Sequence, residues 1–484
     1  MSEQKERWKY TREFKLEAVR PYESGGKSMR AIERGLGITP YLLAKGLGLA
    51  AIMVFLTTSC IVPTSSTHTI TPTAVIQSTT SSSPNLNSDI QWLKANAIPF
   101  DTTEPNHSFE DLMPLKKIIG DARIVALGEA THGTHEFLQM KHRMLKFLVE
   151  EMGFNIFAME ANWPEANLIN DYVHTGKGEP AQILRGYAGD EGEEVLDMIE
   201  WMRAYNENPS NTRKISFYGF DIANAGPMAK NNVAQYMQKV DPQAATQVAD
   251  NYSCNPGNSI ACQTKLQAVY DWLGQRQADY TAKSSSEEFS FALHSARVAI
   301  QYQDFTAQNN SGLIRDLYMA ENVTWILDQA GPDAKIVLWA HNGHVGMSAD
   351  ENFQTMGNHL RQQYDNQMVV FGFLFYQGSF NACGTANLQT LGVGAFYVGA
   401  PPTNSYESFF HEAGLPRFFL DLRSVKEGTA ASDWLLVPHP FRQIGGCYHP
   451  NVMQSGFETA ALSRVFDVVI YFQDTSPSIL LLEK

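Results

Sequence analysis

Five acidic and imidazole residues stand at the ends of apolar runs of this chain, and these are Glu129, His132, Glu160, His341 and His344. A histidine has an ordinary pKa of about 6.5, so its ring is able to take a proton from water near neutral pH. A carboxylate bonded to the far ring nitrogen fixes the tautomer of the histidine and steadies its protonated form. Residues of these two types therefore indicate activation of a water molecule by a general base, which is the chemistry that ester hydrolysis needs.

The apolar runs predict buried strands that hold these residues at one rim of a sheet. Residues 122–127 and 154–159 read as strands, and residues 136–152 between them have helical spacing. This order predicts a βαβ unit with parallel strands. The run 335–340 predicts a further strand. Because ligands of such sheets bind beyond the carboxyl ends of the strands, we expect the acids and imidazoles to meet there.

Local turn chemistry is the alternative explanation for the first of these residues. Glu129 would then cap the helix that follows it, and His132 would be an ordinary turn residue. For one such residue by itself, this explanation is the commoner one. The second pair, His341 and His344, makes it insufficient, because turn chemistry does not predict imidazoles at the end of another strand.

The same segments resemble the erythromycin esterase-like hydrolases. That family has a strand ending Gly-Glu-x-x-His-Gly, then Glu-Phe at the start of a helix and Gly-Phe before a strand that ends in Glu. A later strand ends Ala-His-Asn-x-His-Val. The matching residues of this chain are Gly128, Glu129, His132, Gly133, Glu136, Phe137, Gly153, Phe154, Glu160, Ala340, His341, Asn342, His344 and Val345. Order and intervals agree, and the resemblance extends from about residue 89 to the C-terminus, more weakly after about residue 380.

The resemblance implies an active site made of Glu129, His132, Glu160, His341 and His344, with either His132 or His341 as the base. It implies a carboxylic ester or a macrocyclic lactone as the small-molecule substrate. Macrolide antibiotics are one known use of the family, so a role in antibiotic resistance is among the expectations. The family leans towards metal-independent chemistry, and we expect no metal and no cofactor.

Three further residues are predicted to contact the substrate. Lys141 and Arg143 lie on the helix after the first motif, where they would place positive charge over the pocket. A solvated helix face explains these two cations equally well. Asp221 ends the predicted strand 214–221, and capping of the next segment is its alternative role.

Other chemistries have weaker support in the sequence. A nucleophilic serine is disfavoured because no Gly-x-Ser-x-Gly turn occurs. The alternative function is a surface-tethered protein that binds a metal or haem on the same fold without turnover. However, His-x-x-His on a loop differs from the helical His-Glu-x-x-His spacing of zinc enzymes. A haem site would need an axial ligand and an apolar slot rather than two glutamates.

Composition and charge indicate a globular body that does not bind nucleic acid. The 484 residues are 44% apolar and 18% charged, as in ordinary folded proteins. Residues 1–45 hold ten Lys and Arg against six Asp and Glu, which gives them a net charge of +4. Because the net charge of the whole chain is −14, the remaining residues carry a net charge of −18. An acidic body disfavours nucleic acid as its partner. We expect the body to be a monomer.

The predicted fold is an α/β domain over residues 89–484, with a mostly parallel sheet and helices on both faces. Further strands are expected at 214–221, 368–375, 417–422 and 465–472, which brings the count to about six to eight. Residues 228–329 have helical spacing and no strong strand signal. They predict a large helical insertion that covers the site.

The first ninety residues form three segments with different compositions. Residues 1–45 resemble the helix-turn-helix of insertion-sequence transposases, a DNA-reading pattern that stops abruptly. We interpret them as a truncated remnant, and a working DNA-binding head is the alternative. Residues 46–60 pair an apolar stretch with Cys60, like a bacterial lipoprotein signal, although Leu56 stands four positions before the cysteine rather than three. Residues 61–88 are rich in Ser, Thr and Pro and predict a tether.

The location of the protein follows from these segments. Lipidation at Cys60 would anchor it to a membrane outside the cytoplasm, whereas a blocked signal would leave it in the cytoplasm. A free cysteine in an apolar turn is the alternative for Cys60. The other four cysteines permit two disulfides in an oxidising compartment, one between Cys254 and Cys262 and one between Cys383 and Cys447. Four unpaired buried thiols are an equally open alternative.

Overall fold

The computed structural model describes residues 86–185, 192–254, 259–348, 350, 352–386, 389–429, 431–449 and 456–481. The predicted transposase-like remnant, the apolar segment with Cys60 and nearly all of the tether lie outside these residues. The end of the predicted tether is an exception, because helix α4 (Leu86–Asn96) already begins at its last three residues. No helix in these ranges is both long and apolar enough to span a bilayer.

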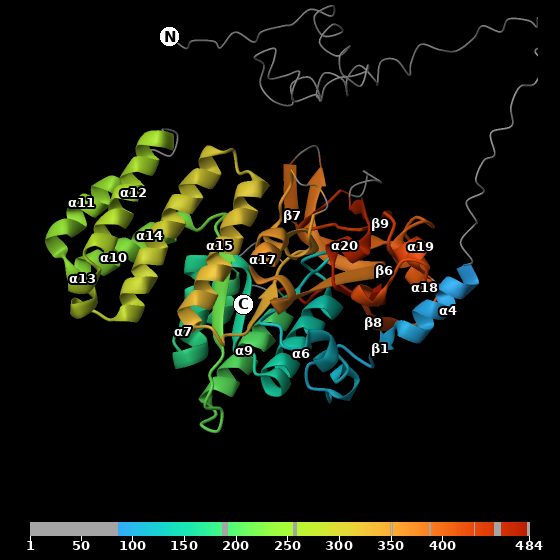
Figure 1. Ribbon diagram of the computed structural model, residues 1–484. Coiled ribbons are helices and arrows are strands. Elements are labelled where there is room, and N and C mark those ends of the chain that lie inside the picture. The colour runs from blue at the N-terminus through green and yellow to red at the C-terminus, as the bar shows by residue number, and fades with distance from the viewer. Residues whose placement is uncertain are drawn as a thin grey trace, which may run out of the picture. The chain divides into compact units, whose positions relative to one another are not determined.

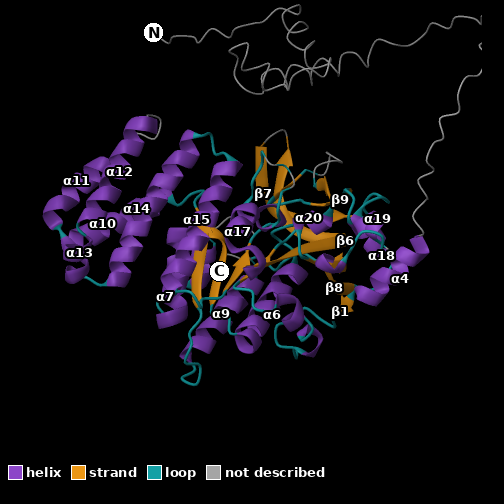
Figure 2. Cartoon of the chain, viewed as in Figure 1, coloured by secondary structure: helices purple, strands orange, loops and turns teal. Residues whose placement is uncertain are grey.

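One ten-stranded sheet organises the described part of the chain (Figures 1 and 2). Its main path runs in the order β1 (Ile98–Pro99), β8 (Arg417–Asp421), β12 (Val468–Thr475), β6 (Met368–Ala386), β2 (Ile124–Leu127), β5 (Ile336–Trp339), β3 (Ile156–Asn162) and β4 (Ser216–Asp221). The strands from β12 to β4 are parallel, whereas β8 and β1 are antiparallel to their neighbours.

Two more strands pair with β6 beyond its parallel core. Strand β7 (Gln389–Val398) forms an antiparallel hairpin with it, and β10 (Cys447–Tyr448) pairs with it in parallel. A separate small sheet joins β9 (His439–Arg442) and β11 (Phe457–Ala460).

Helices cover both faces of the sheet because successive side chains of a strand point to opposite sides. In β2, Val125 and Leu127 join one apolar core with residues of α6 and α9. Ile124 and Ala126 join the other core with residues of α15 and α17. All four side chains are fully buried, which explains why this strand reads as a continuous apolar run. The predicted α/β class with a mostly parallel sheet is confirmed.

Besides α4, the helices outside the segment between β4 and α15 have the bounds that follow. They are α5 (Leu115–Ile119), α6 (His135–Met152), α7 (Trp163–Thr175), α8 (Pro180–Leu184), α9 (Glu193–Glu207), α15 (Gly312–Ala330), α16 (Asn342–Val345), α17 (Met356–Tyr364), α18 (Tyr406–His411), α19 (Ser432–Leu435) and α20 (Leu462–Val465). Short 3-10 turns occupy Glu110–Leu112, Asp365–Gln367 and Leu422–Ser424.

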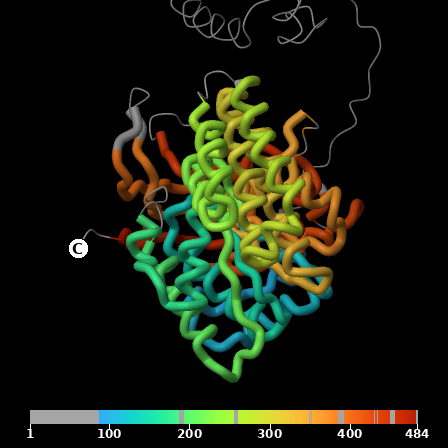
Figure 3. The backbone as a smooth tube through the Cα atoms, turned by 90° about the vertical axis from the view of Figure 1, so that its left-hand side faces the viewer, coloured from blue at the N-terminus to red at the C-terminus, as the bar shows by residue number. Residues whose placement is uncertain are grey.

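In its described residues, the chain between β4 and β5 has helices as its only regular secondary structure. Its helices before α15 are α10 (Gly226–Val240), α11 (Pro242–Tyr252), α12 (Ser259–Gln275), α13 (Gln277–Lys283) and α14 (Ser286–Ala307). Figures 1 and 3 show α10 to α14 as a yellow-green group beside the sheet. Tyr280 and Phe289 are buried in the group's own apolar core. Helix α15 differs because it packs on the sheet and extends to its carboxyl rim.

Candidate active site

The carboxyl ends of β2, β5, β3 and β4 lie side by side, because these strands are parallel neighbours. A cavity of about 250 Å³ opens at this rim. Glu129, His132, Glu160 and Asp221 line it, together with Arg315 from α15. The tertiary structure therefore gathers residues that are far apart in the sequence around one hollow.

Two glycines of the first motif are required by close backbone contacts. A Cβ atom at Gly128 would stand 2.1 Å from Oδ1 of Asn342, and one at Gly133 would stand 2.3 Å from the carbonyl oxygen of Asn381. The Asn342 amide is itself buried and bonds the backbone N–H and C=O of Phe373 on β6. The asparagine of the second motif is therefore structural, since it joins the end of β5 to β6.

Glu129 holds His132 in one tautomer. Nδ1 of His132 donates to Oε1 of Glu129 over 2.7 Å, so the lone pair of the ring is on Nε2. Oε2 of Glu129 accepts from Nζ of Lys141 at 2.5 Å and from Nε1 of Trp339 at 2.9 Å. Burial works to raise the pKa of Glu129, but the Lys141 ammonium and the His132 ring outweigh it and lower that pKa. Glu129 is thus an ionised carboxylate that steadies a positive charge on His132.

Lys141 lies beneath Glu129 rather than over the cavity. Its side chain is fully buried, with Nζ 4.4 Å from the centre of the Trp339 ring. Burial lowers the pKa of Lys141 to about 8, against the attraction of Glu129. Lys141 is not among the residues that line the cavity. Its position therefore suits support of Glu129 better than the predicted contact with substrate.

Arg143 is the one predicted residue that the structure places away from the rim. It lies two positions from Lys141 on α6, so it points to another side of the helix. Its guanidinium binds the carboxylate of Asp111 at 2.6 and 3.0 Å and the carbonyl oxygen of Thr102 at 2.8 Å. The side chain is fully buried by these contacts. Arg143 therefore fastens the loop before α5, and the expectation that it stands over the pocket is corrected.

Arg315 joins two acidic strand ends. Its Nη2 donates to Oε1 of Glu160 at 2.6 Å, and Nε and Nη2 bind the two carboxylate oxygens of Asp221 at 2.9 and 2.8 Å. Glu160 lies where the pairing of β3 with β4 shifts register, between Met159 and Asn162. Burial works against the ionised form of Glu160, but His344 and Arg315 bring its pKa well below the usual range.

Sequence reasoning missed Arg315 and its neighbour Asp316. Both lie in the first turns of α15, where the spacing of apolar residues shows a helix and nothing more. Their partners are remote in the sequence, since 94 positions separate Arg315 from Asp221 and 155 separate it from Glu160. A single sequence therefore contains no local signal for these pairs.

His344 is held between two carboxylates. Its Nδ1 donates to Oδ1 of Asp316 over 2.8 Å, and its Nε2 lies 3.3 Å from Oε1 of Glu160. Burial favours the neutral ring, but these two acids prevail and raise the pKa of His344 to about 10. His344 is consequently an imidazolium at neutral pH, and it has no lone pair with which to act as a base.

The raised pKa of His344 predicts that part of the stability is lost at alkaline pH. The folded pKa of about 10 exceeds the ordinary value of about 6.5, so the stabilisation is complete below pH ~6.5. It declines by about 1.4 kcal/mol per pH unit as pH rises and is gone above the folded pKa. Urea unfolding at several pH values should show this slope in the wild type and a shallower one in His344→Gln. His174 is an exposed histidine, so the control variant His174→Gln should keep the wild-type slope. Equal slopes in all three proteins would contradict the raised pKa of His344.

His341 is neutral, with its proton on the opposite nitrogen from that of His132. The backbone N–H of Gly343 donates to its Nδ1 over 3.1 Å, so the proton of the neutral ring is on Nε2. Burial lowers the pKa of His341 to about 3. Within the described residues, the buried Nε2 has no hydrogen-bond partner. The centres of the His132 and His341 rings are 5.5 Å apart, so the two imidazoles face the same region.

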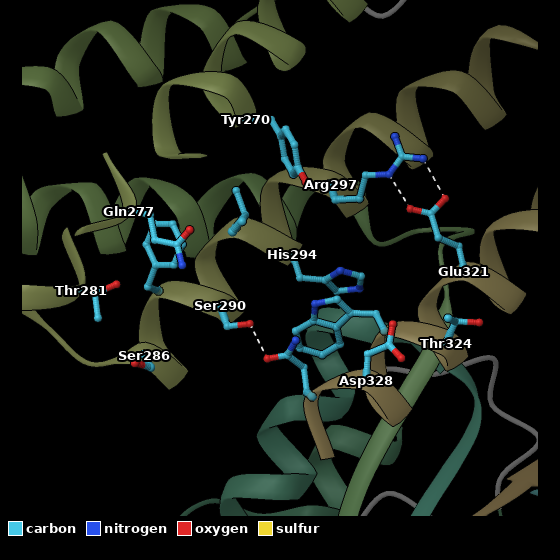
Figure 4. A pocket seen from close by; sticks show the side chains of 14 residues that line it. Tyr270, Gln277, Thr281, Ser286, Ser290, His294, Arg297, Glu321, Thr324 and Asp328 are labelled. Atoms are coloured by element: carbon cyan, nitrogen blue, oxygen red, sulfur yellow. Dashed lines mark hydrogen bonds and ion pairs between the residues drawn. The ribbon is translucent and has the colours of Figure 1, made fainter. Parts of the chain in front are cut away.

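A larger cavity, of about 620 Å³, lies among α12, α13, α14 and α15 (Figure 4). Among its lining residues, His294 stacks on Trp325 with ring centres 4.0 Å apart, and Arg297 binds Glu321. None of the predicted site residues lines it. Size alone therefore does not locate the chemistry, and the smaller cavity at the sheet rim is the candidate active site.

In the ranges that the structure describes, no group of three or more His, Cys, Asp or Glu residues is arranged so that it could hold a metal ion.

Comparisons with known proteins agree with this fold. Erythromycin esterase type II of Escherichia coli is 26% identical to this chain over 431 residues, which cover 80% of this chain and 98% of that protein. A solved structure from Bacillus cereus is 29% identical, with a TM-score of 0.73, over 82% of this chain and 99% of that one. The mutant erythromycin esterase EreC in its open conformation has a TM-score of 0.61 at 17% identity, over 79% of this chain and 98% of that one, and so shares the fold.

The family match covers most of the rim. The residues that it includes are numbered 149–475, and they hold Glu160, Asp221, Arg315, His341 and His344. Membership of a family of esterases indicates a hydrolase. On this match, which spans more than half of the sequence, the chain belongs to the erythromycin esterase family.

Proposed function

We propose that this protein hydrolyses a carboxylic ester or a macrocyclic lactone, with His132 as the general base that activates water. One observation carries the proposal: His132 lines the cavity while its Nδ1 is bonded to the buried, ionised Glu129. A base needs a lone pair within reach of its substrate and a partner that stabilises the charge it acquires. The names of the relatives, which are esterases of erythromycin, supply the class of bond.

His132 suits the role of base better than His341, which the sequence left as its equal. Nδ1 of His341 is occupied by the N–H of Gly343, and its Nε2 is protonated and buried. To accept a proton it would have to give up that backbone bond and become charged inside the protein, and its pKa of about 3 expresses this cost. His341 is instead a neutral N–H donor beside His132.

The proposed reaction moves one proton out and back. Nε2 of His132 takes a proton from water, and the resulting hydroxide adds to the carbonyl carbon of the ester. As the tetrahedral intermediate collapses, the bond between carbon and the leaving oxygen breaks. Nε2 then returns the same proton to the leaving alkoxide, so the histidine ends neutral. Glu129 stabilises the imidazolium that exists between these two transfers.

Arg315 is the proposed donor to the oxyanion. It lines the same cavity, and its Nε and Nη2 are already fixed by Asp221 and Glu160. Nη1 lies 3.1 Å from Nε2 of His344, which carries a proton and therefore accepts nothing. The Nη1 hydrogens are thus held in place for a developing negative charge. Donors that are fixed before the reaction stabilise such a charge without the cost of reorganisation.

A single-turnover experiment in ¹⁸O-labelled water tests direct attack by water. Enzyme in excess over p-nitrophenyl butyrate, and separately over a macrolide lactone, should give an acid product that carries one oxygen atom from the labelled solvent. A covalent route through Glu160, with water attacking the glutamyl carbon of the acyl-enzyme, would instead leave an unlabelled protein oxygen in the first product. Absence of hydrolysis with a broad set of esters and lactones would remove the proposed function altogether.

A further inference from the structure

Residues 443–448, the strap, lie along the backbone of the first motif. The N–H groups of Ile444 and Gly445 both donate to the carbonyl oxygen of Ala130, at 2.8 and 3.2 Å. Thr131 and Gly445 also pair as an isolated parallel bridge. These bonds attach the strap to the two residues between Glu129 and His132. The position of the strap is therefore coupled to the position of the proposed base.

The strap also forms part of the site itself. Gly446 lines the catalytic cavity. Gly445 has a φ of +74°, and a Cβ atom there would stand 3.9 Å from Nε2 of His341. The backbone of the strap thus lies against the buried nitrogen of His341 and supplies one wall of the cavity. Displacement of the strap would uncover Nε2 of His341.

A disulfide fastens the strap to the sheet. Strand β10 has two residues, and they pair with Cys383 and Gly384 of β6. The N–H of Cys383 donates to the carbonyl oxygen of Gly446 over 2.8 Å, and Cys383 is bonded to Cys447. A strand this short contributes few ladder bonds, so the covalent link adds a restraint that the backbone bonds of the strap do not supply by themselves.

We infer that Cys383 and Cys447 are positioning residues for hydrolysis, and that turnover requires their disulfide. The inference rests on the proposed function. With the link in place, the strap keeps the His132 loop in register and His341 covered. With the link broken, only backbone hydrogen bonds to β6 and Ala130 hold the strap, and the base is less firmly fixed relative to the oxyanion donor. Misplacement of a catalytic group by about 1 Å costs up to about a hundredfold in rate.

The second disulfide of the described residues provides a matched control. Cys254 and Cys262 are bonded across a separation of eight residues, between the end of α11 and α12. Neither residue lines the catalytic cavity. Cys447 is exposed, whereas Cys262 is 1% exposed. A reductant should therefore reach the link that holds the strap, and the other pair reports on the general effect of losing a disulfide.

The first experiment compares kcat for p-nitrophenyl butyrate in three full-length proteins. They are the wild type, Cys383→Ser/Cys447→Ser and Cys254→Ser/Cys262→Ser, each with and without dithiothreitol. Each dithiothreitol molecule gives two electrons and two protons to one disulfide, becomes a cyclic disulfide and leaves two protein thiols. We expect kcat to fall about tenfold or more in the strap variant and in reduced wild type. The control variant should retain kcat without reductant and lose it with reductant.

The second readout is hydrogen exchange at the amides of Ile444 and Gly445, which needs no turnover. These amides should exchange faster in the strap variant than in the control variant. Suppose that these amides exchange faster in the strap variant but the wild type hydrolyses no ester. The proposed function would then be wrong, whereas the disulfide would still be shown to hold the strap. Normal kcat in the strap variant, or an equal loss in the control variant, would overturn the inference while the hydrolase assignment stands.

Discussion

Replacement of His132 by asparagine is expected to lower kcat/KM by about a thousandfold, the effect of removing a general base. Asparagine keeps a polar group near Glu129, so the cavity remains polar and ester binding is largely preserved. It has no lone pair basic enough to deprotonate water. The loss should therefore appear mainly in kcat. Steady-state kinetics with p-nitrophenyl butyrate, together with a thermal melt to verify folding, measures it.

His135→Asn is the matched control for this variant. Nδ1 of His135 also bonds a buried glutamate, Glu194, and the ring is similarly exposed, at 25% against 28% for His132. His135 does not line the catalytic cavity. We expect its activity to stay within about threefold of the wild type, since it supplies no group to the reaction. Similar losses of activity in the two variants would mean that both histidines support only the fold. Full activity of His132→Asn would show that His132 is not the general base.

Replacement of Arg315 by methionine is expected to cost both activity and stability. Loss of a fixed oxyanion donor lowers kcat by about a hundred- to a thousandfold. Methionine fills a similar volume but leaves the carboxylates of Glu160 and Asp221 without their guanidinium. Both side chains are largely buried, with 11% and 8% exposed, so the unpaired charges should lower the unfolding free energy by about 3–5 kcal/mol. Urea unfolding and single-substrate kinetics measure the two effects.

Arg297→Met separates catalysis from the loss of an ion pair. Arg297 binds Glu321 through Nε and Nη2 at 2.6 and 2.7 Å, the same geometry by which Arg315 binds Asp221. This pair is more exposed and lies at the larger cavity, so its loss should cost less than about 1 kcal/mol and leave kcat unchanged. Should Arg315→Met unfold more easily yet keep its kcat, Arg315 would be a structural residue and the oxyanion donor would have to be another group.

The sequence by itself determined the sheet and the identity of most residues at its rim. A strand buried on both faces must be apolar throughout, so the apolar runs before Glu129, Glu160 and His341 predicted parallel strands. Parallel neighbours end at the same edge, and polar residues placed directly after several of them must meet. Asp221, at the end of β4, lines the cavity as well. The prediction of a tether over residues 61–88, which rests on composition, extends too far by three residues, because helix α4 already begins at Leu86.

Tertiary structure alone decided what each of these residues is able to do. His341 and His344 stand three positions apart, yet a backbone N–H and burial keep the first neutral, while Asp316 and Glu160 keep the second charged. Those partners come from a helix and a strand far away in the sequence, and so does Arg315. Protonation depends on burial and on the charges within a few ångströms, which residue type and spacing do not encode. The link from Cys383 to Cys447 is likewise a contact across 64 residues, and only the fold shows that it borders the active site.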